Sequence, residues 1–280
     1  MARALGCGVG RFVFWILPRE RRKTLEHLRG VFGAEKTDDE ISKIAENVFV
    51  NLAKTAVDVL RFPVMDRQTV LRLVTLENGT GNLEAALARG HGAIALTGHL
   101  GNWELLGSFF RHLGFPGSIV ARRIYYEPFD RVIVRLRQSG LVSTIYHDDP
   151  PRVLLGELRA NHVVGMSADQ DIDRLDGIFV PFFGKPAWTP TAPAKIALAS
   201  GAAIVPVFLI HEGEGYRLFV EEPIWPDRTQ EKSEAVKMLT VTWSQVVERF
   251  IRKFPDQWVW MHHRWRTSPE ENLVLEERRV

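Results

Sequence analysis

The sequence has little of several features that define whole classes of protein. Its 280 residues include one cysteine, Cys7, which excludes an intramolecular disulfide framework and a zinc site built from several cysteines. Its 36 basic residues exceed its 34 acidic residues by only two, and this near-neutral total argues against a general nucleic-acid binder. No apolar run reaches the ~20 residues of a membrane-spanning helix. The hydrophobic residues that are present, 45% of the chain, are enough for a substantial core.

The N-terminal segment combines apolar and basic residues. Its longest apolar stretch runs from Ala4 to Leu17, is interrupted by Arg11 and is followed by Pro18. Four basic side chains come next: Arg19, Arg21, Arg22 and Lys23. Apolar residues beside a basic cluster are typical of an interfacial membrane anchor. A terminus that packs on the core is the alternative, and a signal peptide is not indicated because no small-residue cleavage site follows.

The hydrophobic pattern changes near residue 90. In the first third, apolar residues recur at helical spacing, most clearly from Ile41 to Leu60. Thr37 and Glu40 have the spacing of a capping box before that helix. Beyond residue 90, helical stretches alternate with short apolar runs that indicate buried strands: 91–97, 118–121, 162–166 and 203–210.

This alternation predicts an α/β fold in which a mostly parallel central sheet is flanked by helices. The helical N-terminal region is expected to pack on that core, because no linker or repeat separates the two parts. We therefore expect a single domain over residues 1–280, with a helical part over 1–90 and an α/β core over 91–270.

The strongest local signal for chemistry is the segment Thr-Gly-His-Leu-Gly-Asn-Trp-Glu at 97–104, which follows a predicted strand and opens a predicted helix. Ligands bind at such strand ends in open α/β sheets. Residues five positions apart do not share a helix face, so we expect His99 in the loop and Glu104 in the first helical turn. Glu104 would then accept a proton from one imidazole nitrogen and leave the other as a general base. A capped turn around a hydrogen-bonded histidine is the alternative.

A second polar cluster follows the predicted strand at 162–166 and contains four carboxylates: Asp169, Asp171, Asp173 and Asp176. It is not an EF-hand loop, because Arg174 stands where that loop needs glycine. Clustered carboxylates at a strand end do suit a hard cation. A metal-dependent phosphoesterase that uses His99 with Asp169 and Asp171 is therefore an alternative function. The adjacent His262 and His263 would point in opposite directions in a strand, so no shared metal site is expected there.

Five blocks of sequence resemble, in order and spacing, those of one known family. They are Leu-Pro-Arg-Glu-Arg-Arg at 17–22, Gly-His-Leu-Gly-Asn-Trp-Glu at 98–104, Ala-Asp-Gln-Asp at 168–171, Val-Pro-Phe-Phe-Gly-Lys-Pro-Ala at 180–187 and Gln-Trp-Val-Trp-Met-His-His-Arg-Trp at 257–265. The family is that of the lipid A biosynthesis acyltransferases (the lauroyl/myristoyl, or late, acyltransferases), within the glycerolipid acyltransferase superfamily and its His-x4-Asp/Glu motif. The resemblance covers roughly residues 15–267.

The resemblance implies that the chain transfers a fatty acyl chain from an acyl–acyl carrier protein to a hydroxyl of a lipid A precursor, with residues 91–270 as the catalytic core. His99 is then the general base, Glu104 orients it, and no cofactor or metal is needed. Asp173 and Asp176 are expected to face solvent. The residues implied to bind substrate are Arg137, Asp169, Arg122, Asn102 and Asp171, with Arg123 as an alternative arginine.

The same resemblance and the local charge predict the partners of the protein and its location in the cell. Residues 1–29 carry seven basic and two acidic side chains, and residues 249–266 carry five and one. Both ends would attract anionic lipid head groups and an acidic carrier protein. We expect the chain at the cytoplasmic face of a bacterial inner membrane. Attachment is expected to be peripheral or interfacial, because the long N-terminal membrane helix common in the family is missing or shortened.

Two features leave alternatives open. Gly98 stands where enterobacterial members often carry Asn, so another glycolipid or an aminolipid is an alternative acceptor. The aromatic segment 178–183 and the C-terminal tryptophans are candidate walls for an acyl-chain groove, with core packing as the alternative.

Overall fold

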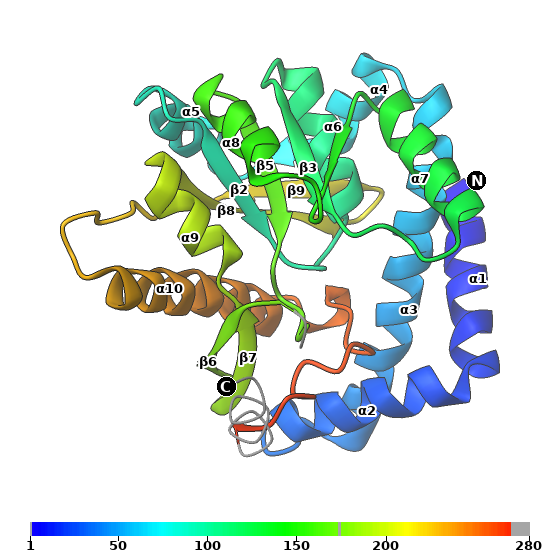
Figure 1. The fold of residues 1–280 in the computed structure, drawn as a ribbon. Helices are drawn as coiled ribbons and strands as arrows, with labels where there is room; N and C mark the ends of the chain where they lie inside the picture. Colours follow the sequence, from blue (N-terminus) through cyan, green and yellow to red (C-terminus); the bar gives the residue numbers. More distant parts are fainter. Residues whose placement is uncertain (1, 173–174, 270–280) are drawn as a thin grey trace.

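The structure, a computed structural model, describes residues 2–172 and 175–269. Helices form the N-terminal part of the chain (Figure 1): α1 (Ala2–Ile16), α2 (Pro18–Phe32), α3 (Asp38–Arg61), the short 3-10 helix η1 (Phe62–Val64), α4 (Arg67–Leu73) and α5 (Gly81–Leu87). The predicted capping box is present at the start of α3. The Glu40 N–H donates to Thr37 Oγ1, and the Thr37 N–H donates to the Glu40 carboxylate.

Seven strands build the central sheet in the order β1-β9-β8-β2-β5-β3-β4. Their bounds are β1 (Val74–Leu76), β2 (Ala93–Thr97), β3 (Gly117–Ala121), β4 (Ser143–Tyr146), β5 (Val163–Ser167), β8 (Ala203–Glu212) and β9 (Gly215–Val220). Every adjacent pair of these strands is parallel except β8 and β9, which form an antiparallel hairpin. The predicted α/β fold with a mostly parallel sheet is therefore confirmed.

Helices cover both faces of this sheet (Figure 1). They include α6 (Trp103–Leu113), α7 (Glu127–Ser139), α8 (Pro151–Arg159), α9 (Ala192–Ser200) and α10 (Lys232–Lys253). Along β2, Ile94 and Leu96 join one hydrophobic core with α9 and α10, whereas Ala93 and Ala95 join another with α5 and α6. Burial on both faces explains why the strand is apolar from Ala93 to Leu96. The antiparallel strands β6 (Gly177–Phe182) and β7 (Lys185–Pro190) lie outside the central sheet.

Helix α1 packs on α3 through its small residues. A Cβ atom at Gly10 would lie 2.5 Å from Val50 Cα, and one at Gly6 would lie 3.4 Å from a methyl group of Val57. Phe14 is also buried, against Phe49 of α3, but most of the other large apolar side chains of α1 are exposed: Leu5, Val9, Phe12, Trp15 and Ile16. Within residues 2–172 and 175–269, no helix is both long and apolar enough to cross a bilayer.

Candidate active site

His99 lies in the turn that joins β2 to α6. Gly101 has a positive φ of 64°, and a Cβ atom there would lie 2.1 Å from the carbonyl oxygen of Leu209, so the turn requires glycine at this position. The segment after α10 holds the turn from the other side. The Val259 N–H donates to the His99 carbonyl (3.1 Å), and the Gly101 N–H donates to the Gln257 carbonyl (3.0 Å). The backbone around His99 is therefore fixed by residues distant in sequence.

A carboxylate from the end of β5 holds the His99 ring. His99 Nδ1 is 2.7 Å from Asp169 Oδ1, and the His99 backbone N–H donates to Asp169 Oδ2 at 2.7 Å. The Trp258 indole N–H also donates to Asp169 Oδ2, at 2.7 Å. Asp169 is buried, and three donors satisfy its two oxygens. It therefore orients the imidazole and the loop together.

Burial and charge act in opposite directions on this pair. Burial lowers the pKa of His99, but the neighbouring Asp169 carboxylate outweighs that effect and holds the pKa above the ordinary histidine value of 6.5. Burial raises the pKa of Asp169, yet His99 and Trp258 hold it far below its usual range. Asp169 is therefore ionised at neutral pH and stabilises a proton on His99 Nδ1. His99 Nε2 is left as the basic nitrogen.

Glu104 has a different partner from the one expected. It lies in the first turn of α6, as predicted, but its carboxylate accepts two hydrogen bonds from Arg137, from Nε at 2.9 Å and from Nη2 at 2.7 Å. The role of orienting His99, which the motif spacing assigned to Glu104, is taken in the structure by Asp169. Glu104 instead fixes the Arg137 guanidinium at the wall of the cavity that contains His99.

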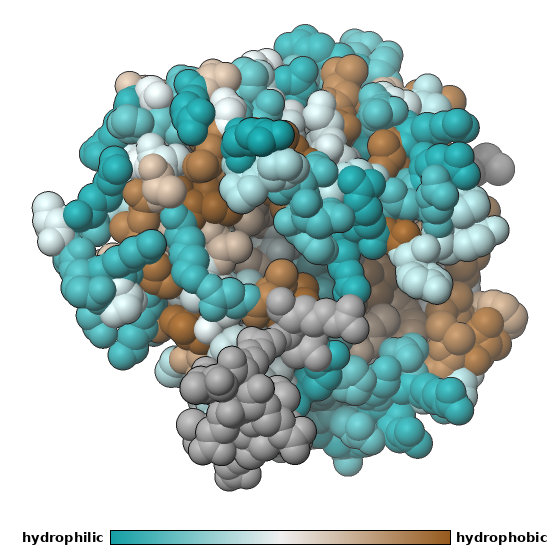
Figure 2. All heavy atoms as spheres, in the orientation of Figure 1, coloured by the Kyte–Doolittle hydropathy of each residue, from teal (hydrophilic) through white to brown (hydrophobic). Residues whose placement is uncertain are grey.

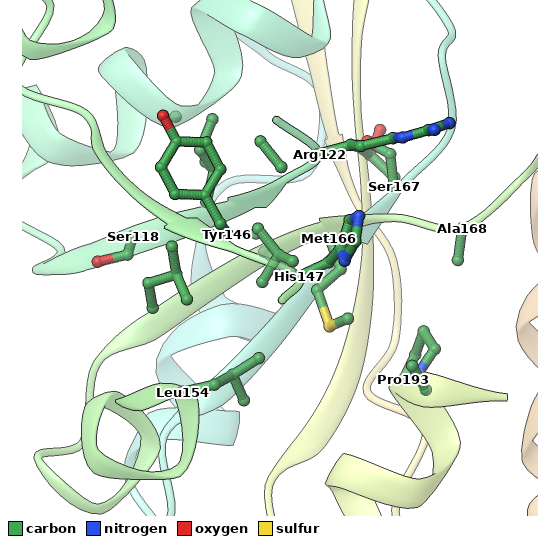
Figure 3. Close-up of a pocket in the computed structure, with 18 of the residues that line it drawn as sticks. Ser118, Arg122, Tyr146, His147, Leu154, Met166, Ser167, Ala168 and Pro193 are labelled. Carbon is green, nitrogen blue, oxygen red and sulfur yellow. The ribbon is translucent and has the colours of Figure 1, made fainter. Parts of the chain in front are cut away.

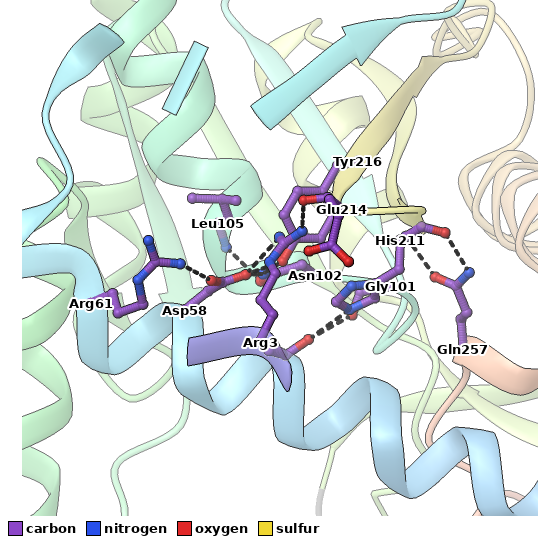
Figure 4. A network of polar contacts seen from close by, with 11 residues as sticks. Arg3, Asp58, Arg61, Gly101, Asn102, Leu105, His211, Glu214, Tyr216 and Gln257 are labelled. Carbon is purple, nitrogen blue, oxygen red and sulfur yellow. Dashed lines mark hydrogen bonds and ion pairs between the residues drawn. The ribbon is translucent and has the colours of Figure 1, made fainter. Parts of the chain in front are cut away.

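Asn102 does not reach this cavity. It is fully buried, its side chain caps α6 by accepting from the Leu105 N–H (2.9 Å), and its amide donates to the Tyr216 hydroxyl (2.6 Å). Figure 4 shows the network to which it belongs, in which Arg3 and Tyr216 also contact the buried Asp58. The expectation that Asn102 binds substrate is therefore replaced by a structural role.

The other residues expected at the site are spread around the cavity. Asp171 lines it and accepts from the backbone N–H (2.7 Å) and the hydroxyl (2.8 Å) of Thr267. Arg122 lines it and is exposed, whereas Arg123 is bound to Asp148 and Asp149. Asp176 is exposed to solvent, as expected, and it forms an ion pair with Lys195. Asp173 lies outside the described residues.

A cavity of about 1020 Å³ opens beside His99. Its wall is mainly apolar, and Glu104 and Arg137 are among the polar residues that line it with His99. Figure 3 shows part of the apolar wall, with Leu154 from α8, Met166 from β5 and Pro193 from α9. A large, mainly apolar cavity next to a basic nitrogen suits a substrate with a long hydrocarbon chain and a reactive polar end.

The aromatic residues proposed as a groove wall lie elsewhere. Phe182 and Phe183 belong to a core cluster with Trp258 and Trp260, and all four side chains are buried. None of them lines the cavity. The alternative of core packing is therefore the correct interpretation of Phe182, Phe183 and these two tryptophans. Trp103, inside the His99 motif, does line the cavity.

The carboxylates near His99 are not arranged to bind a metal. Over residues 2–172 and 175–269, no group of three or more His, Cys, Asp or Glu side chains could hold an ion. The oxygens of Asp169 are occupied by His99 and Trp258, and those of Asp171 by Thr267. Among the described residues, therefore, no ligand set for the phosphoesterase alternative is present.

Two residues at the site were not anticipated from the sequence. Trp258 contacts Asp169, and Gln170 lies 3.1 Å from His99 Nδ1. Both belong to sequence blocks already singled out, 168–171 and 257–265. Their roles were hidden because each contact joins segments that lie far apart along the chain.

Known proteins resemble this chain over most of its length. The bacterial lipid A biosynthesis acyltransferase family matches residues 1–267. A phosphatidylinositol mannoside acyltransferase of Mycobacterium tuberculosis (strain CDC 1551 / Oshkosh) is 33% identical over 206 residues, which are 71% of this chain and 63% of that protein. The match thus spans less than two thirds of the M. tuberculosis relative.

Two further relatives match more of the chain at lower identity. The Mycolicibacterium smegmatis phosphatidylinositol mannoside acyltransferase is 27% identical over 258 residues, 89% of this chain and 79% of the relative. The lipid A biosynthesis palmitoleoyltransferase of Escherichia coli K12 is 25% identical over 281 residues, 97% of this chain and 87% of the relative. The family match confirms the resemblance of the five sequence blocks, and the chain belongs to the bacterial lipid A biosynthesis acyltransferase family.

Proposed function

We propose that this chain is an O-acyltransferase that moves a fatty acyl chain from an acyl–acyl carrier protein to a hydroxyl group of a glycolipid. The observation that carries the proposal is the His99–Asp169 pair at the wall of a cavity of about 1020 Å³ with mainly apolar walls. Membership of the acyltransferase family supports the same reaction. A base beside an apolar cavity provides what acyl transfer needs, namely activation of a hydroxyl and a place for the chain.

The reaction proceeds by general base catalysis. His99 Nε2 takes the proton of the acceptor hydroxyl while Asp169 holds the proton on Nδ1. The hydroxyl oxygen attacks the thioester carbonyl, and the departing thiolate receives the proton from the imidazolium. The raised pKa of His99 makes it a stronger base than an ordinary histidine. No protein nucleophile is required, and the sequence has no Gly-x-Ser-x-Gly elbow.

The acceptor is proposed to be a lipid A precursor. Arg137, held by Glu104, and Arg122 bring positive charge to the cavity wall, where a phosphate of such a glycolipid would bind. A phosphatidylinositol mannoside is the second candidate, and the 33% identity to the M. tuberculosis relative favours it. Both are glycolipids with a free hydroxyl and a phosphate, so the same residues serve either one.

The acyl transfer is tested with purified protein and labelled acyl–acyl carrier protein. Kdo-modified tetra-acyl lipid A and phosphatidylinositol mannoside are offered separately, and the lipid products are identified by mass spectrometry. We expect one acceptor to gain a single acyl chain, and His99→Ala to abolish the transfer. Failure with both acceptors, while the protein remains folded, would contradict the proposed function. Mass spectrometry of lipids from cells with and without the protein identifies the natural acceptor.

The enzyme is proposed to work at the cytoplasmic face of the inner membrane. In Figure 2, apolar residues gather at the edge of the molecule where Figure 1 shows the end of α1 next to α2. Exposed Phe12 and Trp15 lie there with exposed Arg11 and Arg19. Apolar side chains flanked by arginines suit insertion into a bilayer with anionic head groups.

A further inference from the structure

Gln170 lies against the face of the His99 ring. Its amide nitrogen is 3.1 Å from His99 Nδ1 and 3.2 Å from His99 Nε2. An atom this close to both nitrogens would clash with the C–H group between them if it lay in the ring plane, so it lies over the face of the imidazole and not along an in-plane lone pair. The lone pair of Nε2 is therefore left for a substrate hydroxyl. His99 and Gln170 both line the cavity.

His262 holds this amide from the other side. The Gln170 amide nitrogen is 2.9 Å from His262 Nε2, and the rings of His262 and His99 are 5.6 Å apart. Burial, and then the charge of protonated His99, lower the pKa of His262 to about 4. A neutral imidazole accepts a hydrogen bond on its unprotonated nitrogen. His262 thus fixes one amide hydrogen of Gln170 and leaves the second for another acceptor.

We propose that the Gln170 amide donates the hydrogen bond that stabilises the negatively charged carbonyl oxygen formed during acyl transfer, with His262 as its positioning residue. This inference rests on the acyl transfer proposed above. An oxyanion donor has to be a fixed donor next to the reacting carbonyl. Gln170 meets both conditions, because it lies against the base and is anchored by His262. Asp169 and Glu104 are acceptors, and Arg137, held by Glu104, is assigned above to the phosphate of the acceptor.

One acyl transfer breaks the acceptor O–H bond and the thioester C–S bond, and forms one C–O bond and one S–H bond. The acceptor O–H bond breaks, its proton moves to His99 Nε2, and its electron pair forms the new C–O bond. The π electrons of the thioester carbonyl move to oxygen, where the Gln170 N–H donates to them. When the carbonyl re-forms, the C–S bond breaks and the sulfur takes the proton from His99. The products are an ester and the free thiol of the carrier.

The first test replaces Gln170 by residues of similar size that donate no hydrogen bond, Gln170→Met and Gln170→Glu. We expect kcat to fall on the order of 10²- to 10³-fold with little change in KM, because the lost interaction exists only in the transition state. A trifluoromethyl ketone analogue of the acyl donor, whose hydrate mimics the oxyanion, should bind more weakly to Gln170→Met. A thioether analogue without a carbonyl should bind as it does to the wild type.

The second test separates the positioning role of His262 from a general effect on folding. His262→Phe should lose kcat in the same direction as Gln170→Met, whereas His262→Gln, whose side-chain oxygen still accepts the amide hydrogen, should retain most of the activity. In the double variant Gln170→Met/His262→Phe, the two losses should not add, because both act through one hydrogen bond. Thermal unfolding of each variant serves as the folding control.

The outcomes distinguish this inference from the proposed function. If Gln170→Met keeps wild-type kcat and analogue affinity while His99→Ala is inactive, the oxyanion role is overturned and the acyl transfer stands. The same holds if His262→Gln is as impaired as His262→Phe although both variants fold. If the wild type transfers no acyl chain to any acceptor, the proposed function itself fails.

Discussion

Among single residues, Asp169 has the largest expected effect on His99. Asp169→Asn keeps the shape of the side chain but removes the charge that raises the pKa of His99. In the proposed mechanism the reaction needs neutral His99, so kcat/KM should rise with pH through that pKa. We expect the acid limb of the pH profile to move to lower pH in Asp169→Asn, and the rate to fall on the order of 10²- to 10⁴-fold. Steady-state kinetics across pH measure both changes.

A neighbour from the same acidic cluster provides the control. Asp176 is exposed and pairs with Lys195, so Asp176→Asn should leave the acid limb in place. An unchanged pH profile in Asp169→Asn would show that another group sets the titration of the base.

Trp258 is expected to affect the pKa of His99 through its hydrogen bond to Asp169. Its indole N–H donates to Asp169 Oδ2 at 2.7 Å, and Trp258→Phe removes that bond. The less neutralised carboxylate should hold the proton of His99 more strongly, so the acid limb moves to higher pH. Trp260→Phe is the matched control, because Trp260 is equally buried but donates to the Pro255 carbonyl (2.6 Å). A shift of the same size in both variants would contradict the assignment.

Glu104→Gln tests the revised role of the motif carboxylate. The substitution weakens the two hydrogen bonds to Arg137 but leaves the contact between His99 and Asp169 intact. We therefore expect KM for the phosphorylated acceptor to rise by roughly tenfold, the scale of a charge-assisted hydrogen bond, with a smaller loss of kcat. A loss confined to kcat, with no change in KM for the acceptor, would return the orienting role to Glu104.

At the scale of elements, α1 is unusual because it exposes most of its large apolar side chains while its glycines pack on α3. Phe12 is 63% exposed and Trp15 is 67% exposed. We expect Phe12→Ser with Trp15→Ser to lower the fraction of protein that floats with phosphatidylglycerol-containing vesicles, because each aromatic side chain contributes burial on the order of 1.5–3 kcal/mol in a bilayer interface. Flotation through a density gradient measures that fraction.

The control for α1 lies on another helix. Met238 on α10 is also exposed, at 42%, so Met238→Ser should leave flotation unchanged. If the α1 and α10 variants lose the same fraction of floating protein, or if the α1 variant loses none, α1 is not the membrane contact.

Elements that depend on local pattern were predicted well. The capping box at Thr37 and the helix after it follow from spacing alone, since both involve residues within one or two turns. The strand β2 and the helix that follows His99 were likewise expected from periodicity. The packing of α1 was not, because which face of an apolar helix is buried depends on the partner it meets, here α3.

At the scale of the whole molecule, His211 joins three parts of the chain. It lies on β8, its ring is 3.2 Å from the Thr55 hydroxyl on α3, and its backbone exchanges hydrogen bonds with Gln257 after α10 (Figure 4). Burial, followed by the charges of Lys54 and Arg3, lowers its pKa to about 3. The folded protein therefore holds His211 in the neutral form.

This depressed pKa predicts how stability changes with acid. The unfolded chain binds a proton at His211 below its ordinary pKa of 6.5, whereas the folded protein does not until about pH 3. The free energy of unfolding should thus fall between these values, by about 2 kcal/mol from this residue at pH 5. Urea unfolding of wild type and His211→Gln at pH 7 and pH 5 tests this, and the variant should lose less stability. If wild type and His211→Gln lose the same free energy of unfolding between pH 7 and pH 5, His211 does not titrate in this way.

Local periodicity and short motifs were sufficient to predict the α/β fold and the family, and to single out His99 and Arg137, which both line the cavity, because each signal lies within a few consecutive residues. The pairing of His99 with Asp169, 70 positions away, was decided only in three dimensions. The same is true of Trp258, Gln170 and His262, which meet around one imidazole through loops at the ends of different elements. A sequence specifies which side chains are present near a strand end. The packing of the chain determines which of them come within hydrogen-bonding distance, since that depends on how the elements cross.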